Sequence, residues 1–188
     1  MHDLLRFTIL CLLIVGSSTC LGQSSTGGQE SPQQQIASTN GDPSWRPSAA
    51  QLQAIEAVTR SYFALRDSGN AEQAYALLSP RQKQYMTQSN FTQLLEGFNA
   101  NAGKPQGRFL RKVTWYKDTP QAGPGLYVAV DYSSKFERLA LHCGYVVWHE
   151  QPEGSFLQVR EEMNVIDNAT MAKIKPEQLE SVRAQFRC

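Results

Sequence analysis

The stretch that decides the fold is CGYVVWHEQPEGSFLQVREEMNVI, residues 143–166. Both halves are rich in valine and aromatic residues, which favour β-strands, and the second half alternates apolar and polar side chains. The segment PEG (152–154) between them has the proline and glycine of a tight turn. We therefore predict an antiparallel hairpin in which Gln151 lies opposite Ser155.

This pairing predicts which side chains face the core, because successive side chains of a strand point to opposite faces. The predicted core face carries Leu141, Cys143, Tyr145 and Val147 together with Leu157, Val159, Met163 and Val165. The predicted solvent face carries His142, Trp148, Gln158, Arg160, Glu162 and Asn164. A bulge near Gly144 would invert this assignment locally.

Residue types that bind metals gather in the first half of the hairpin, at His142, Cys143 and His149. The two histidines are seven positions apart and so face opposite sides of a strand. Cys143 and His149 share a face, but six residues of strand separate them by about 20 Å. A zinc ion holds its ligands at about 2.0–2.3 Å. We therefore predict no metal site here, and no bound cofactor.

Glu161 breaks the apolar pattern of the predicted core face, and Tyr145 is its predicted cross-strand neighbour. A carboxylate beneath a helix layer is costly unless it is paired or hydrogen-bonded. One interpretation is a catalytic or ligand-anchoring carboxylate in a pocket, with Tyr145 as hydrogen-bond donor. The other is a glutamate at a pocket mouth or sheet edge that is bonded to an arginine.

Helical patterns precede the strands. Ser48 and Gln51 form a predicted capping box, after which apolar residues recur at three- and four-residue steps. Ser79 and Pro80 form a second helix start. Strands are expected over residues 107–118, 126–133, 138–151 and 155–167, and a last helix from residue 176 onward. This order predicts an α+β fold, with helices packed on a curved antiparallel sheet of about four strands, and a C-terminal helix.

The first 46 residues indicate the cellular location of the protein. The apolar run FTILCLLIVG (7–16) is too short to span a bilayer core about 30 Å thick, and small residues follow it. Residues 1–22 therefore fit a secretory signal peptide. The alternative is a lipoprotein that is cut before Cys20 and anchored to the membrane there. Residues 23–46 are rich in Gln, Ser, Gly, Thr and Pro, which predicts a disordered linker.

Two cysteines, Cys143 and Cys188, remain after removal of the signal peptide. An even pair in an exported chain favours a disulfide. The chain has 18 Lys and Arg against 17 Asp and Glu, so its charge gives no reason to expect a nucleic acid partner. We expect an α+β domain over residues 47–168, a C-terminal helix over 169–188, and a periplasmic location.

The order of elements, with DSGNAEQAYALLSP (67–80), resembles the nuclear-transport-factor-2-like, or cystatin-like, cone. Residues 50–167, through the strands GLYVAVDYSSKF (125–136) and the hairpin, resemble an exported bacterial family, domain of unknown function 4019. The resemblance implies a pocket between sheet and helices, on a fold that serves isomerases, dehydratases, hydrolases and binding modules. Enzymes of this group place an Asp or His base inside the cone, whereas Asp131 and His142 are predicted to share the outward face.

These observations predict a non-enzymatic exported domain that binds an envelope protein or a small apolar ligand. Trp148, Tyr127 and Val146, on the predicted outer face of the sheet, would supply the contact surface, including that of a homodimer. The alternatives are a pocket enzyme of the isomerase or hydrolase type that uses Glu161, and a periplasmic immunity or inhibitor protein.

Overall fold

The computed structural model describes residues 31–39, 41–120, 123–186 and 188. The predicted signal peptide, the lipidation candidate Cys20 and the first part of the predicted linker lie outside the described residues. None of the helices in the described ranges has the length and apolarity needed to cross a membrane.

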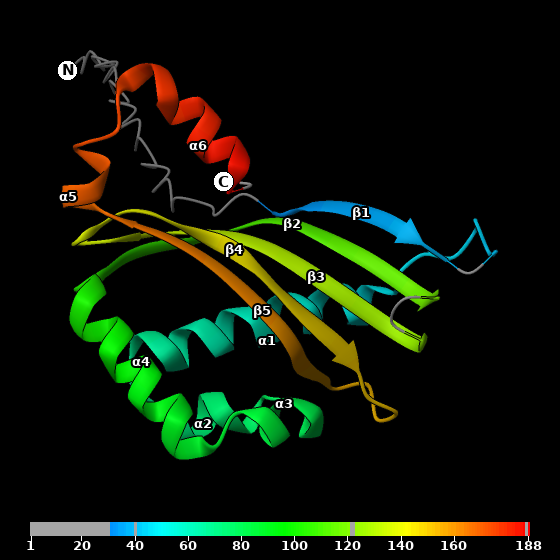
Figure 1. Cartoon of the computed structure of the whole chain (residues 1–188). Coiled ribbons are helices and arrows are strands. Elements are labelled where there is room, and N and C mark those ends of the chain that lie inside the picture. The colour runs from blue at the N-terminus through cyan, green and yellow to red at the C-terminus, as the bar shows by residue number, and fades with distance from the viewer. Residues whose placement is uncertain (1–30, 40, 121–122, 187) are drawn as a thin grey trace, which may run out of the picture.

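Within the described part of the chain, four helices precede the long strands: α1 (Ala49–Asp67), α2 (Ala71–Ala76), α3 (Pro80–Tyr85) and α4 (Gln88–Ala102). The predicted capping box at the start of α1 is confirmed, because the Ser48 side chain accepts from the Gln51 backbone and the Gln51 side chain accepts in return. Ser79 caps α3, because its side chain accepts from the Gln82 backbone, and Pro80 lies in the first turn. All four helices lie on one side of the sheet (Figure 1).

The sheet has five strands: β1 (Gln33–Ser38), β2 (Pro105–Thr119), β3 (Gly123–Phe136), β4 (Leu139–Glu150) and β5 (Phe156–Asp167). Their spatial order is the order of the sequence, so β1 and β5 are the edges. β1 runs parallel to β2, and all other pairs are antiparallel. The α+β class is therefore confirmed, and the long strands curve over the four helices (Figure 1).

Strand β1 corrects two predictions, because it adds a strand to the expected four and lies within the segment expected to be disordered. Two contacts hold it in place. Ile36 packs against the core, and the indole nitrogen of Trp115 donates a hydrogen bond of 2.8 Å to the Gln34 side chain. A polar composition does not reveal such contacts, since they come from a strand that is distant in the sequence.

The predicted turn of the β4–β5 hairpin is confirmed, since the Gln151 amide donates to the Ser155 carbonyl at 2.7 Å. The predicted register fails a few residues later. Trp148 pairs with Gln158, but Val147 pairs with Arg160, so Val159 is an extra residue that forms a bulge. The bulge lies on β5 and not near Gly144.

The bulge reverses the predicted faces of β4. Val146 and Trp148 are fully buried against the helices. The odd-numbered residues of β4, predicted to face the helices, point to the other side of the sheet. On β5, Glu161 and Met163 do share the helix side as predicted, because they come after the bulge.

A second, smaller apolar cluster lies on the other face of the sheet. Leu141 and Cys143 of β4 and Ile166 of β5 pack there against Val182 and Phe186. These last two residues belong to the predicted C-terminal helix, α6 (Leu179–Gln185), and its end. The short helix α5 (Asn168–Met171) and a single 3-10 turn (Pro176–Gln178) connect β5 to α6. The C-terminal helix is thus confirmed, and it covers the face opposite to α1–α4 (Figure 1).

Candidate functional site

A hollow of about 530 Å³ lies between β5 and helices α1, α3 and α4, and we call it the α4 hollow. Its volume falls within the range of small-molecule sites, about 300–1,000 Å³. Its apolar lining consists of Leu78, Met86, Phe91, Leu94, Leu95, Phe98 and Met163. Its polar lining consists of Tyr62, Arg66, Gln82, Gln158 and Glu161.

Glu161 lies at this hollow, and its side chain is only 16% exposed. It forms an ion pair with Arg66. Tyr62 donates a hydrogen bond of 2.8 Å to one carboxylate oxygen, and Tyr132 donates one of 3.3 Å to the other. Glu161 is therefore both bonded to an arginine and next to a cavity. We call these four residues the Glu161 cluster.

The electrostatics of the Glu161 cluster keep the two tyrosines and Arg66 protonated. Burial, and then the charge of Glu161, raise the pKa of the Tyr62 hydroxyl well above its ordinary value, and the same causes raise the pKa of Tyr132. Burial, the largest single influence, acts to lower the pKa of the Arg66 guanidinium, but Glu161, Tyr62 and Tyr132 together outweigh it and raise that pKa. Both tyrosines are thus hydrogen-bond donors at neutral pH, and the charge of Arg66 balances that of Glu161.

Tyr145, the predicted partner of Glu161, is not a member of this cluster. It pairs with Glu162 and faces the other side of the sheet, so the predicted contact is wrong. The sequence analysis did not identify Tyr62 and Arg66 as the partners of Glu161. The available signal was their spacing: they are four residues apart in α1, so an arginine follows a tyrosine on one helix face.

Gln158 was predicted to face solvent, and this is wrong, because only 4% of the residue is exposed. Its backbone is held on both sides: its amide donates to Leu77 and its carbonyl accepts from Ser79, each at 2.8 Å. Gln158 lines the α4 hollow, and its side chain forms no hydrogen bond to another described residue. The bulge at Val159 places Gln158 and Glu161 on the same face although they are three positions apart.

His142, Cys143 and His149 lie in three separate environments, as strand alternation predicts. His142 is buried among aromatic rings on the helix side, which corrects its predicted exposure. Cys143 lies beside Cys188 on the α6 side. His149 stacks on Tyr127, with ring centroids 4.4 Å apart.

Asp131 does not share a face of the sheet with His142, so the prediction that both face outward together is wrong. It pairs with Tyr145 across β3 and β4, on the side away from α1–α4. There its carboxylate lies 3.3 Å from the ammonium of Lys112. The carboxylate and the imidazole are thus separated by the sheet.

The predicted outer contact surface is wrong in two of its three residues. Trp148 and Val146 have no exposed area, and the Trp148 ring packs edge-on against Tyr62 at 5.7 Å. Tyr127 lies half-buried on the opposite face, where it stacks on His149. A partner contact through Tyr127 stays a prediction.

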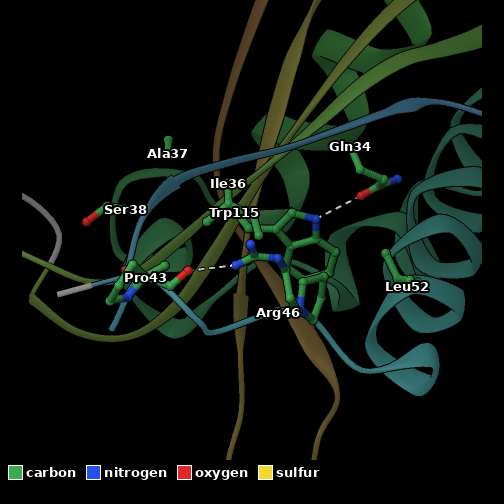
Figure 2. Close-up of a pocket in the computed structure, with 10 residues that line it drawn as sticks. Gln34, Ile36, Ala37, Ser38, Pro43, Arg46, Leu52 and Trp115 are labelled. Carbon is green, nitrogen blue, oxygen red and sulfur yellow. Dashed lines mark hydrogen bonds between the residues drawn. The ribbon is translucent and has the colours of Figure 1, made fainter. Parts of the chain in front are cut away.

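A second hollow, of about 650 Å³, lies between β1 and the start of α1. Trp115 and Arg46 are among the residues that line it (Figure 2). Arg46 donates to the carbonyls of Pro43 and Trp45 at 2.8 and 2.7 Å, and Trp115 donates to Gln34. The hydrogen bonds of Arg46 stay within its own loop, whereas the bond from Trp115 fastens β1 to β2.

The predicted cysteine pair is at disulfide distance, with the Cα atoms of Cys143 and Cys188 5.8 Å apart at a sequence separation of 45. Replacing both by serine should lower the free energy of unfolding by about 2–4 kcal/mol, because the bond restricts the unfolded chain. Urea unfolding with and without a reducing agent measures this. Equal stability under both conditions, with two free thiols by mass spectrometry, would refute the bond.

A family model described as a protein of unknown function, DUF4019, matches residues 58–159. The match spans more than half of the 188 residues. The chain belongs to this family. The DUF4019 segment begins within α1 and ends at the bulge of β5, so it includes Tyr62, Arg66 and Gln158, while Glu161 lies two residues beyond it. No curated protein and no solved structure matches the chain.

Proposed function

We propose that this domain binds a small, largely apolar molecule in the α4 hollow and does not transform it. The observation that carries the proposal is the lining of the hollow: seven apolar side chains surround it, and its one carboxylate is already neutralised. Apolar pockets with a few convergent polar groups are the common form of small-molecule sites.

The saturation of Glu161 favours binding over catalysis. A general base must accept a proton from the substrate. Both oxygens of Glu161 instead accept hydrogen bonds from Arg66, Tyr62 and Tyr132. An isomerase or hydrolase that used Glu161 would first have to break the ion pair with Arg66, which is buried.

The rim of the hollow supports entry of an apolar molecule from solvent. Leu94 is 62% exposed and Met163 is 39% exposed, and both line the hollow. Clustered exposed apolar residues at a cavity are typical of binding sites.

The periplasm is the proposed location, and the nuclear-transport-factor-2-like cone is the proposed architecture. A cysteine pair at disulfide distance supports export, since disulfides persist in oxidising compartments. The curved sheet, with four helices on one face and a hollow between the layers, supports the cone (Figure 1).

The test is binding of the neutral fluorescent probe N-phenyl-1-naphthylamine. We expect its fluorescence to rise on binding, and Leu94→Gln to weaken binding roughly five- to tenfold, because the substitution removes apolar contact at the rim. Tyr85→Gln is the matched control, since Tyr85 is 77% exposed but does not line the hollow. Absence of probe binding, or equal effects of both substitutions, would refute the proposal.

A further inference from the structure

We propose that the molecule bound in the α4 hollow has an uncharged head group that both donates and accepts hydrogen bonds, as a primary carboxamide does, and that Gln158 binds this head group. This inference rests on the proposed function and adds the chemical class of the ligand. It comes from the one buried glutamine of the hollow and from the balance of charge beside it.

The side chain of Gln158 is the first observation. Only 4% of Gln158 is exposed, and the residue lines the hollow. Its side chain has no hydrogen-bond partner among the described residues, so its amide is left to bind what enters the hollow. An amide has two N–H donors and a carbonyl acceptor, so a ligand amide can pair with it through two hydrogen bonds.

The position of Gln158 is fixed and not incidental. Its backbone is bonded to Leu77 and Ser79, which form the junction between α2 and α3. The neighbouring amide of Gln82 is already used, since it donates to the carbonyl of Val159 in the bulge. Of the two glutamines that line the hollow, Gln158 is the one whose side chain has no hydrogen bond to another described residue.

The charges at the hollow favour an uncharged head group. Of the described residues that line it, only Arg66 and Glu161 are charged, and they form an ion pair with each other. A carboxylate or ammonium on the ligand would enter a largely buried site without a free counter-ion, which is costly. A neutral amide avoids this cost.

The arrangement also places the rest of the ligand. Gln158 lies on the sheet side of the hollow, and Leu94, Leu95 and Phe98 come from α4 on the other side. A head group at Gln158 would thus lead into an apolar body that packs along α4 toward the exposed rim at Leu94.

The experiment is displacement of N-phenyl-1-naphthylamine by octanamide, octanoate and octylamine, which share one apolar chain. On the unaltered protein we expect octanamide to displace the probe at roughly tenfold lower concentration than either charged compound. Gln158→Met keeps the length of the side chain and removes its hydrogen bonds, so it should raise the octanamide concentration needed by roughly tenfold. Titration of the probe alone gives its affinity for this variant, and each displacing concentration is corrected for that affinity.

Gln73→Met is the control, because Gln73 is exposed on α2 and does not line the hollow. Probe binding without any difference in octanamide displacement between Gln158→Met and the unaltered protein would overturn the inference and leave the proposed function standing. Absence of probe binding would overturn both. If Gln158→Met fails to fold by circular dichroism, the order of the three compounds decides, and tighter binding of octanoate or octylamine would overturn the inference.

Discussion

Replacing Glu161 with glutamine should lower the free energy of unfolding by about 3–5 kcal/mol, because the change leaves the guanidinium of Arg66 buried without its counter-ion. The two side chains are only 14% and 16% exposed, so water does little to replace the lost partner. Urea unfolding monitored by circular dichroism measures the change.

The matched control is the same substitution one position along the strand. Glu162 forms an ion pair with Arg160, but those side chains are 48% and 62% exposed. Surface pairs contribute about 0–1 kcal/mol, so Glu162→Gln should cost no more than that. Equal effects at the two positions would contradict the buried pair.

A double variant separates the ion pair from its surroundings. Arg66→Met combined with Glu161→Leu removes both charges, so neither remains buried without a partner. We expect the double variant to lose less stability than the sum of the two single variants, with a coupling energy of about 0.5–3 kcal/mol. Additive losses would show that the two side chains act independently.

The sign of the Glu161→Gln effect also bears on the catalytic alternative. Catalytic groups are commonly held in strained or destabilising environments, so that replacing them tends to raise stability at the expense of activity. A carboxylate that accepts hydrogen bonds from Arg66, Tyr62 and Tyr132 should instead contribute to stability. A stabilising Glu161→Gln would therefore favour the pocket enzyme over the binding domain.

Local signals in the sequence predicted most of the fold. Helix caps at Ser48 and Ser79 depend on neighbouring residues, and so does the turn that places Gln151 opposite Ser155. The bulge at Val159 depends on α3 instead, because Gln82 donates to its carbonyl from 77 positions away. One extra residue exchanges the two faces of a strand, so this contact reversed the prediction for all of β4.

The sequence likewise predicted only part of the candidate site. Glu161 stood out because it broke an apolar pattern, and it does lie on the helix side. Its partners did not stand out, since Tyr62 and Arg66 are 99 and 95 positions away. Gln158 carried no signal at all, because its burial follows from the bulge.

His142 should make stability depend on pH between about 3 and 6.5. It is 4% exposed, it contacts the rings of Phe98 and Phe136, and neither of its nitrogens has a hydrogen-bond partner among the described residues. Burial first, and then the charges of Arg108 and Arg66, lower the pKa of His142 from 6.5 to about 3. The imidazole is therefore neutral in the folded protein at pH 5, where the unfolded chain would protonate it.

The sign follows from which state binds the proton. Between these two pKa values the unfolded chain holds one proton more than the folded protein, so stability rises with pH. The contribution is complete above pH 6.5 and falls by about 1.4 kcal/mol for each pH unit below it, until about pH 3. His142→Phe removes this dependence and keeps an aromatic ring among the same neighbours.

We therefore expect the unaltered protein to lose about 2–3 kcal/mol more unfolding free energy than His142→Phe when the pH falls from 7.5 to 4.5. Urea unfolding at pH 4.5, 5.5 and 7.5 measures the difference at each pH, so that carboxylates common to both proteins cancel. His149→Phe, on the opposite face of the same strand, controls for the loss of a histidine as such. A His142→Phe curve that runs parallel to that of the unaltered protein would show that His142 takes up its proton at the same pH in the folded and unfolded states, and would contradict its burial among the rings.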